Sequence, residues 1–241
     1  MNESSFIDNR RVAVIVAAAG QGVRMGLGYP KAMMSIGGEA MLSMTVKTLS
    51  TVKECRDLVI TAPPANVDEF SDEALKGWGL PFPPKVIPGG STRQKSVLAA
   101  LETASPDCDV IVIHDAARPL IDVDTVEESV SAAREHGASV VAVPAKDTVI
   151  EVDGDGFISE TTDRSRFWLV QTPQTFRRDV ILEAHRDARH SGFEATDDTA
   201  LVRRLGGSVK VVEGKYNNIK VTTSDDVAVV ENYLRTREKF L

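Results

Sequence analysis

Cysteine, basic charge and long apolar runs are all scarce in this sequence, and each shortage excludes a class of protein. Among 241 residues there are only 2 cysteines, Cys55 and Cys108, which are too few for a disulfide framework and are typical of a reducing compartment. The longest apolar run, residues 12–19, is far shorter than the ~20 residues that cross a bilayer. The opening segment MNESSFIDNR is too polar for a secretory leader. We therefore expect a cytoplasmic protein that has no membrane partner.

Basic residues are in the minority, since 28 lysines and arginines stand against 35 acidic residues and give a net charge of -7. This balance argues against a nucleic-acid partner, which usually needs a broad basic surface. Hydrophobic residues make up 42% and charged residues 26%, as in an ordinary globular protein. The length suits one large domain, and no internal repeat or linker divides it. We expect residues 1–241 to form a single domain from which a β-arm projects.

Short β-branched runs alternate with helical patterns along the first part of the chain. The predicted strands are apolar on both faces, as strands covered by helices on two sides must be, and comprise residues 12–17, 57–62, 85–87, 109–114 and 138–143. Helical patterns lie between them at residues 40–50, 91–104 and 122–137, with Ser91 as the expected N-cap of the second. This alternation predicts an α/β fold, a three-layer sandwich around a mostly parallel sheet.

The alternation stops at residues 147–164, where two alternating runs flank the turn DGDG and predict a β-hairpin. A two-stranded ribbon is marginally stable alone, so it must either fold back on its own domain or reach onto a second subunit. Beyond the hairpin, the patterns predict helices at about 177–190, after Asp197 and from near Ser224, with strands at 208–214 and 218–221.

Two stretches contain no acidic residue, although the chain as a whole is acidic. Residues 11–38 hold Arg11, Arg24 and Lys31 in and around a glycine-rich turn, and residues 74–101 include a second such turn, PGGSTRQKS. Glycines allow backbone N–H groups to approach a phosphate closely, and both turns would meet at the carboxyl edge of the sheet. The pattern predicts a ligand that carries several phosphates.

The first turn matches neither of the two common phosphate-binding motifs. In the dinucleotide motif G-x-G-x-x-G, Gly20 and Gly22 fit but the third position is Met25, so a dehydrogenase is not expected. In the P-loop motif the lysine precedes Ser or Thr, whereas Lys31 precedes Ala32. The turn must therefore be identified from the other motifs of the chain.

A series of motifs, taken in order, resembles one enzyme family over nearly the whole chain. The motifs are AAAGQGVRMGLGYPK (17–31), PGGSTRQKSV (88–97), HDAARP (114–119), KDT (146–148), TDR (162–164), QTPQTF (171–176), TDD (196–198) and NIKVTTSDD (218–226). The sequence resembles the cytidylyltransferases that join CTP to 2-C-methyl-D-erythritol 4-phosphate, with release of pyrophosphate, in the non-mevalonate isoprenoid pathway. The resemblance implies a modified Rossmann-like sheet of the sugar-nucleotidyltransferase type, Mg²⁺ or another divalent cation, and a homodimer formed through an arm at about 147–168.

The resemblance also assigns roles to individual residues. Catalytic roles fall to the basic residues Arg24, Lys31, Arg164 and Lys220, and Arg164 would serve the site of the second subunit because it lies on the arm. The implied CTP-binding residues are Ala18, Ala19, Gly20, Gly22, Gly89, Gly90, Ser91, Arg93, Ser96 and Ala116. The implied sugar-phosphate pocket comprises Asp115, Thr148, Arg164, Thr172, Thr196 and Lys220, and Asp115 is the implied metal ligand as well.

The implied chemistry needs cations more than it needs a general base. The second ionisation of a phosphomonoester lies near pH ~6, so the attacking oxygen is largely ionised at neutral pH. We expect His114, at the end of a buried strand, to form structural hydrogen bonds rather than to act as a base. We expect the acidic motif at 196–198 both to cap a helix and to contact substrate.

Two positions depart from the family pattern. The residue after Lys31, often Gln in the family, is Ala32, and the residue before NIK, often acidic, is Asn217, which leaves Asp115 as the main metal candidate. Two alternatives stay open: a D-ribitol 5-phosphate cytidylyltransferase, which shares the fold and most CTP motifs, and a nucleotide-binding regulatory module without catalysis. The intact set of catalytic residues argues against the second alternative.

Overall fold

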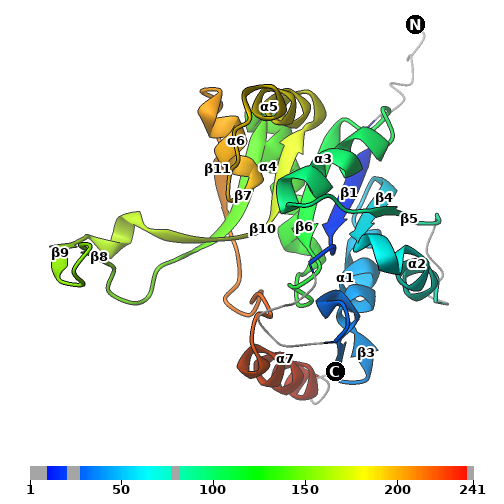
Figure 1. Cartoon of the computed structure of the whole chain (residues 1–241), viewed down its shortest axis with the longest axis horizontal. Coiled ribbons are helices and arrows are strands. Elements are labelled where there is room, and N and C mark those ends of the chain that lie inside the picture. Colours follow the sequence, from blue (N-terminus) through cyan, green and yellow to red (C-terminus); the bar gives the residue numbers. More distant parts are fainter. Residues whose placement is uncertain (1–9, 21–27, 77–81, 238–241) are drawn as a thin grey trace, which may run out of the picture.

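A mixed sheet of seven strands forms the centre of the computed structural model, which describes residues 10–20, 28–76 and 82–237 (Figure 1). Its strands are β1 (Val12–Ala17), β4 (Cys55–Ala62), β5 (Lys85–Pro88), β6 (Val110–Asp115), β7 (Ala138–Pro144), β10 (Trp168–Arg177) and β11 (Lys210–Glu213). The strand order is β11-β7-β10-β6-β1-β4-β5, and β10 alone in this sheet runs antiparallel to its neighbours. The predicted α/β fold with a mostly parallel sheet is confirmed.

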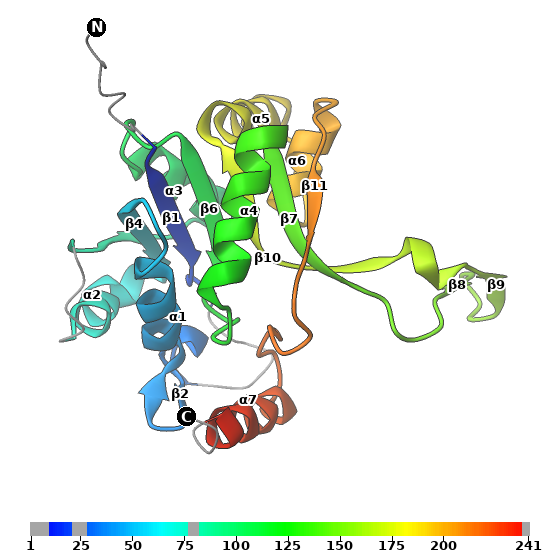
Figure 2. The same cartoon turned by 180° about the vertical axis from the view of Figure 1, so that it is seen from behind.

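Helices cover both faces of this sheet, as the two opposite views in Figures 1 and 2 show. They are α1 (Met41–Ser50), α2 (Val67–Leu75), α3 (Arg93–Thr103), α4 (Val123–His136), α5 (Arg178–Ser191), α6 (Asp198–Arg204) and, away from the sheet, α7 (Ser224–Arg237). Val14 and Val16 of β1 contribute to a buried cluster with α1, α2 and α4, whereas Ala13 and Ile15 contribute to one with α3, α5 and α6. Successive side chains of a strand point to opposite faces, so a strand covered on both sides is apolar throughout.

Side-chain caps define several helix starts. The carboxylate of Asp122 accepts the Thr125 N–H at the start of α4, and Asp197 caps α6 in the same way. The predicted cap of α3 is wrong by one residue, because Thr92 accepts the Lys95 N–H at the N-cap. The Ser91 hydroxyl instead lies 3.2 Å from the Lys95 ammonium.

Several elements are missed by the sequence patterns, among them the short strands β2 (Ser35–Ile36) and β3 (Glu39–Ala40), and one strand is predicted wrongly. Neither α2 nor β10 is predicted, and β10 lacks an apolar run because Gln171, Thr172, Gln174 and Thr175 are buried polar residues. The strand predicted at 218–221 is wrong, since this segment is irregular and is joined to the β6–α4 loop through the Val221 N–H and the Ala117 carbonyl. A polar sequence can occupy the centre of a sheet only where its side chains find hydrogen-bond partners.

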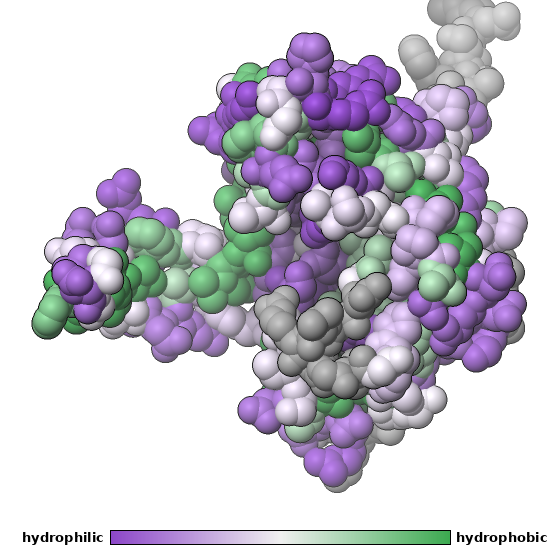
Figure 3. Space-filling model, in the orientation of Figure 1, coloured by the Kyte–Doolittle hydropathy of each residue, from purple (hydrophilic) through white to green (hydrophobic). Residues whose placement is uncertain are grey.

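The predicted hairpin is confirmed and forms an arm that projects from the body of the molecule (Figures 1 and 2). It consists of β8 (Ile150–Val152) and β9 (Ile158–Thr161), and it does not fold back on its own domain. The apolar side chains of Val152, Phe157 and Ile158 are exposed, Phe157 to 72%. Figure 3 shows hydrophobic residues on this arm and at its root.

Helix α7 lies apart from the central sheet, next to the short hairpin of β2 and β3 (Figures 1 and 2). Val230 of α7 packs into a third cluster with Val221, Met34 and Ile36, the last on the short hairpin of β2 (Ser35–Ile36) and β3 (Glu39–Ala40). Lys31 lies in a 3₁₀ turn, Lys31–Met33, directly before this hairpin. Within the described part of the chain, no helix is long and apolar enough to cross a membrane.

Candidate active site

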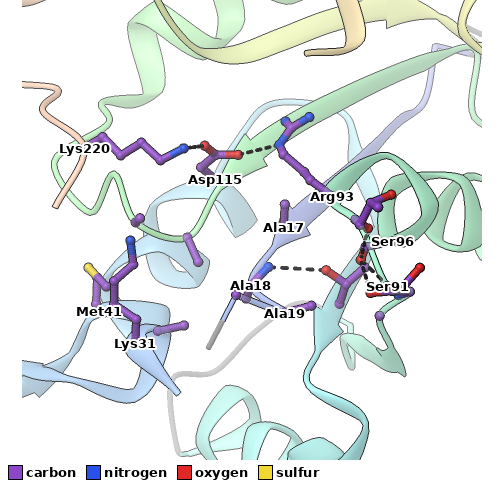
Figure 4. A pocket seen from close by; sticks show the side chains of 18 of the residues that line it. Ala17, Ala18, Ala19, Lys31, Met41, Ser91, Arg93, Ser96, Asp115 and Lys220 are labelled. Atoms are coloured by element: carbon purple, nitrogen blue, oxygen red, sulfur yellow. Dashed lines mark hydrogen bonds and ion pairs between the residues drawn. The ribbon is translucent and has the colours of Figure 1, made fainter. Parts of the chain in front are cut away.

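A cavity of about 790 Å³ opens at the carboxyl edge of the sheet, where the predicted phosphate-binding turns meet. Its walls come from the loops after β1, β5 and β6 and from the segment that leads into α7. The corresponding surface is hollowed and hydrophilic near the centre of the face drawn in Figure 3. The lining includes Ala18, Ala19, Gly20, Lys31, Gly89, Gly90, Ser91, Arg93, Ser96, Asp115, Ala116 and Lys220 (Figure 4).

The loop after β1 is held against the neighbouring strand β4. The Ala18 N–H donates to the carbonyl oxygen of Thr61 at 3.1 Å and lies 3.3 Å from its hydroxyl. Gly20 follows at the cavity wall, and a Cβ there would meet no atom within 4 Å. Gly22 and Arg24, predicted to bind CTP and to act in catalysis, lie outside the described residues.

The loop after β5 lies against the loop after β1 at Gly89, and its next residue, Gly90, lies against the start of α3. A Cβ on Gly89 would lie 2.4 Å from the Cβ of Ala19, and one on Gly90 would lie 2.6 Å from the Cβ of Lys95. The Gly90 N–H donates to the Ser96 hydroxyl at 3.0 Å, which fixes the turn to the first turn of α3. Residues 17–20 after β1 and residues 89–91 after β5 therefore form one continuous wall of the cavity.

Asp115, at the end of β6, is the centre of the charged side of the cavity. One carboxylate oxygen accepts the Arg93 Nε–H at 3.1 Å and the other accepts from the Lys220 ammonium at 2.6 Å (Figure 4). Burial opposes ionisation of this carboxyl, but the charges of Arg93 and Lys220 outweigh it and hold its pKa well below the usual range. Asp115 is therefore ionised, and it fixes two cations beside the cavity.

Lys31, from the N-terminal part of the sequence, is a third cation at the same cavity. The Lys31 ammonium donates to the carbonyl oxygen of Val221 at 2.8 Å, and Val221 directly follows Lys220. This bond joins the Lys31 side chain to the backbone of the segment that carries Lys220. Fixed cations of this kind are suited to hold phosphate groups.

His114 has a structural role, as the sequence predicts. Its Nε2–H donates to the Arg118 carbonyl at 3.1 Å, and Nδ1 accepts from the Thr172 hydroxyl at 3.0 Å. That hydroxyl in turn accepts the Asp115 N–H at 3.1 Å. Complete burial lowers the pKa of His114 to about 4, so the ring is neutral at physiological pH and supports the backbone of Asp115.

Four of the predicted site residues do not line this cavity. Thr172 lies beneath it, with its hydroxyl bonded to His114 and to the backbone of Asp115. Thr196 is exposed before the cap of α6. Thr148 and Arg164 lie on the arm, which extends away from the body, and Arg164 donates to the Lys146 carbonyl at 2.7 Å.

A buried layer behind Arg93 was not predicted: the motif at 196–198 was expected to contact substrate, but its Asp198 is buried and does not line the cavity. Asp198 accepts from Arg93 Nη1 at 2.6 Å and from His185 Nε2 at 3.0 Å, and its backbone N–H donates to the Gln174 side chain at 3.0 Å. Asp198 belongs to the TDD motif, whose first aspartate, Asp197, is the helix cap. The sequence signal for this layer was Asp198 itself, a second aspartate that the helix does not need, because Asp197 already serves as its N-cap.

The donor set at the cavity suits a divalent cation that arrives with phosphates. Within residues 10–20, 28–76 and 82–237, no group of three or more His, Cys, Asp or Glu side chains is placed to hold a metal ion. Among the described residues that line the cavity, Asp115 contributes the one carboxylate, and its oxygens can accept further contacts besides the two ion pairs. Mg²⁺ commonly binds through one or two carboxylates together with substrate phosphates and water.

A glycine-rich wall, three converging cations and one carboxylate at the carboxyl edge of an α/β sheet define an enzyme of the nucleotide-phosphate-binding class. Comparison of sequences gives the family. The profile of the 2-C-methyl-D-erythritol 4-phosphate cytidylyltransferase family matches residues 12–236. The chain belongs to this family.

Individual relatives agree with the family match over nearly their whole lengths. The chain is 40% identical over 228 residues to the 2-C-methyl-D-erythritol 4-phosphate cytidylyltransferase of Pelotomaculum thermopropionicum, with 95% of this chain and 96% of the relative aligned. It is 38% identical over 226 residues to that of Caldanaerobacter subterraneus, with 93% and 99% aligned. Among solved structures, the Thermus thermophilus enzyme of this name superposes with a TM-score of 0.77 at 34% identity, over 93% of this chain and 99% of that one. The 4-diphosphocytidyl-2C-methyl-D-erythritol synthase of Anaerococcus prevotii superposes with a TM-score of 0.84 at 29% identity, over 95% and 100%.

Proposed function

We propose that the protein catalyses the reaction of CTP with 2-C-methyl-D-erythritol 4-phosphate to give 4-diphosphocytidyl-2-C-methyl-D-erythritol and pyrophosphate, a step of isoprenoid precursor biosynthesis. The family membership supports this assignment over nearly the full chain. The observation that carries it in this chain is the convergence of Lys31, Arg93 and Lys220 on one glycine-walled cavity. Such a site is suited to two phosphorylated substrates that must be held together despite their mutual repulsion.

CTP would lie along the glycine-rich wall. The close contact between Gly89 and Ala19 supports a narrow slot for the base and ribose, in which backbone groups rather than long side chains form the walls. Ala18, Gly90 and Ser91 extend the same wall, and the triphosphate would then point toward Lys31. We retain Gly22 and Arg24 as part of this proposed binding surface on the basis of the sequence.

The reaction would proceed by direct displacement at the α-phosphorus. An oxygen of the sugar phosphate forms the new P–O bond, and the bond to pyrophosphate breaks with its electron pair on the leaving oxygen. Lys31 would stabilise the charge that develops on the triphosphate, and Lys220, fixed by Asp115, would hold the incoming phosphate. A general base is not needed, because the phosphomonoester is largely ionised above pH ~6, and His114 is buried and neutral.

A divalent cation, Mg²⁺ in the simplest case, is proposed to enter on the triphosphate, with Asp115 as the protein ligand. When bound, the cation would neutralise phosphate charge. Among the described lining residues only Asp115 carries a carboxylate, which supports a metal that is held chiefly by the nucleotide.

We propose a single catalytic domain and a homodimer formed through the arm at about 147–168. The exposed apolar residues Val152, Phe157 and Ile158 support an arm that packs on a second copy, since a ribbon with such residues is marginally stable in water. Thr148 and Arg164 would then complete the sugar-phosphate pocket of the partner. Thr196 is proposed to reach the acceptor from beside α6, and a cytoplasmic setting stays a prediction from the sequence.

The test is a measurement of pyrophosphate release from CTP and Mg²⁺ with each acceptor in turn. We expect release with 2-C-methyl-D-erythritol 4-phosphate and formation of the cytidine diphosphate ester by mass spectrometry. A clear preference for D-ribitol 5-phosphate would move the assignment to that acceptor. Binding of CTP without pyrophosphate release from either acceptor would indicate a regulatory nucleotide-binding module.

A further inference from the structure

The carbonyl that holds Lys31 belongs to a peptide group whose N–H is also held by a side chain. The Val221 carbonyl oxygen accepts from the Lys31 ammonium at 2.8 Å, and the Thr222 N–H of the same peptide group donates to a carboxylate oxygen of Asp226 at 2.7 Å. Because a trans peptide group is planar, its C=O and N–H point in opposite directions. The bond that fixes the N–H on Asp226 therefore also fixes the direction in which the carbonyl meets Lys31.

Asp226 lies in the first turn of α7, the red helix of Figure 1, and one of its oxygens accepts from four donors. Besides the Thr222 N–H, these are the Thr222 hydroxyl at 2.8 Å, the Thr223 N–H at 2.8 Å and the Thr223 hydroxyl at 3.0 Å. Burial opposes ionisation of Asp226, but the hydrogen bonds outweigh it and lower the pKa of this carboxyl. Asp226 is therefore a carboxylate, and its hydrogen bonds are charge-assisted.

Helix capping explains only part of this cluster. Thr223 directly precedes α7, its hydroxyl oxygen lies 3.4 Å from the Asp226 backbone nitrogen, and the two residues form a capping box. A capping box does not involve the residue before the cap, yet Thr222 makes the shortest of the four bonds to Asp226. Thr222 lines the cavity, whereas Asp226 is not among the described residues that do. The bond to Thr222 thus links the start of the helix to the cavity.

The other backbone bond of Val221 does not fix the direction of its carbonyl. The Val221 N–H donates to the Ala117 carbonyl at 2.8 Å, but this N–H belongs to the preceding peptide group. Rotation about the two single bonds that flank the Val221–Thr222 peptide group turns the Val221 carbonyl and leaves the contact with Ala117 in place. Asp226 opposes this rotation from the N–H side. Its negative charge and the positive charge of Lys31 also polarise the peptide group in the same direction, which strengthens both hydrogen bonds.

We propose that Asp226 is a positioning residue for Lys31, because it orients the Val221–Thr222 peptide group so that the carbonyl holds the ammonium at the cavity. Lysine has three N–H donors, so it can hold this carbonyl and phosphate oxygens together. The inference rests on the proposed function, since Lys31 is proposed to stabilise charge on the triphosphate. It adds α7, which lies apart from the central sheet, to the elements that determine the rate. Misplacing a catalytic group by ~1 Å lowers a reaction rate strongly.

Steady-state kinetics of Asp226→Ala, with pyrophosphate release as the readout, give the first test. We expect kcat to fall roughly tenfold, because the carbonyl turns and Lys31 loses its defined position. The KM for the acceptor should change by about twofold or less, since Lys220 keeps its bond to Asp115. A wild-type kcat, or a rise in acceptor KM in place of the fall in kcat, would overturn the proposal.

Two control variants separate this effect from stabilisation of α7. Asp225→Ala removes the same charge from the same helical turn, and we expect wild-type kinetics. Thr223→Ala removes the hydroxyl of the capping box and keeps the bond between the Thr222 N–H and Asp226. It should lower the melting temperature by about 2–4 °C and leave kcat within about twofold of wild type. A tenfold lower kcat in either control would overturn the proposal, because the loss would then follow from the helix start.

A double-mutant cycle tests whether Asp226 acts through Lys31. In a Lys31→Ala background, Asp226→Ala should change kcat by about twofold or less, because the ammonium that it positions is gone. The full tenfold effect in that background overturns the inference.

Asp226→Asn takes the place of Asp226→Ala in the cycle if the alanine variant does not fold. Its amide oxygen can accept from the Thr222 N–H, but without the negative charge, so we expect kcat to fall about threefold. This fall should disappear in the Lys31→Ala background. A wild-type kcat in Asp226→Asn, or a threefold fall that persists without Lys31, contradicts the positioning role. Failure of the proposed function is separate, since it would appear as no pyrophosphate release by the wild-type enzyme.

Discussion

Lys31 and Val221 are 190 positions apart in the sequence, and a hydrogen bond of 2.8 Å joins the ammonium of the first to the carbonyl oxygen of the second. This bond connects the segment after the first glycine-rich turn to the C-terminal segment that carries Lys220. The Lys31 side chain is therefore bonded to the residue that follows Lys220, and both lysines line the cavity.

Replacement of Lys31 should separate catalysis from folding. We expect Lys31→Ala to lower kcat by about 10²- to 10³-fold, because a fixed cation next to the triphosphate is lost. The melting temperature should change little, since the side chain is only partly buried. Lys31→Arg keeps the charge but changes its shape, and we expect it to recover only part of the activity. Near-normal turnover of Lys31→Ala in the pyrophosphate assay would contradict the role of this lysine.

Mixed dimers should recover activity if Arg164 serves the site of the second subunit. Lys31→Ala and Arg164→Ala are each expected to be nearly inactive as pure proteins. In a heterodimer of the two, one site would have both residues, so a dissociated and reassociated equal mixture should reach about a quarter of wild-type activity. The pyrophosphate assay on mixed and unmixed samples checks this. No recovery, despite subunit exchange shown by mass spectrometry, would place Arg164 outside the partner's site.

Gly89 should tolerate no side chain. A Cβ at this position would lie 2.4 Å from the Ala19 Cβ and 2.9 Å from the Ser96 hydroxyl, so Gly89→Ala must push the two glycine-rich turns apart. Overpacking of this kind costs about 1–3 kcal/mol, and we expect a similar loss of CTP binding free energy by calorimetry. Gly154→Ala is the control, since a Cβ in that exposed turn of the arm meets no atom within 4 Å. Unchanged CTP affinity in Gly89→Ala would argue against the proposed slot.

The stability of the protein should fall in mildly acidic solution because of His114. Its pKa is lowered from 6.5 to about 4 by burial, so between these values the unfolded chain binds a proton that the folded chain does not. The free energy of unfolding should therefore decrease as the pH falls from 6.5 to 4, by about 3 kcal/mol from this group.

Urea unfolding at a series of pH values measures this effect. His114→Gln cannot titrate, and we expect its free energy of unfolding to depend less steeply on pH in the same window. His190→Gln, at an exposed position of α5, should keep the wild-type profile. Equal pH slopes for wild type and His114→Gln would contradict the assignment.

Much of the fold could be predicted from the sequence because buried parallel strands and capped helices leave local signals. The run at 12–17 corresponds to β1 residue for residue, and the caps at Asp122 and Asp197 begin the predicted helices. Strand β10 could not be predicted this way, because its buried positions are polar and their partners lie elsewhere in the sequence. Its membership of the sheet follows from tertiary hydrogen bonds that no local pattern contains.

In the site, too, residues within local motifs could be predicted, whereas residues that depend on tertiary contacts could not. The glycine-rich turns, Lys31, Asp115 and Lys220 could be identified from their motifs, and the structure gathers them at one cavity. The buried contacts of Asp198 with Arg93 and His185 were not predicted, because an aspartate at a helix start and a histidine within a helix have ordinary local explanations. These contacts depend on the approach of α5 and α6 to Arg93, which only the packed structure determines.

The pairing of β10 with two neighbouring strands also determines how the arm is anchored against a pulling force. Residues 168–170 pair with the end of β7 at the root of the arm, and residues 174–177 pair with β6 while 174–176 also pair with β7. A force that pulls on the arm along this strand must break several backbone hydrogen bonds at once, in shear, rather than one after another. The arm is therefore anchored by backbone hydrogen bonds to two neighbouring strands, and a pull on it is transmitted to Thr172, the residue of the same strand that supports Asp115 beneath the cavity.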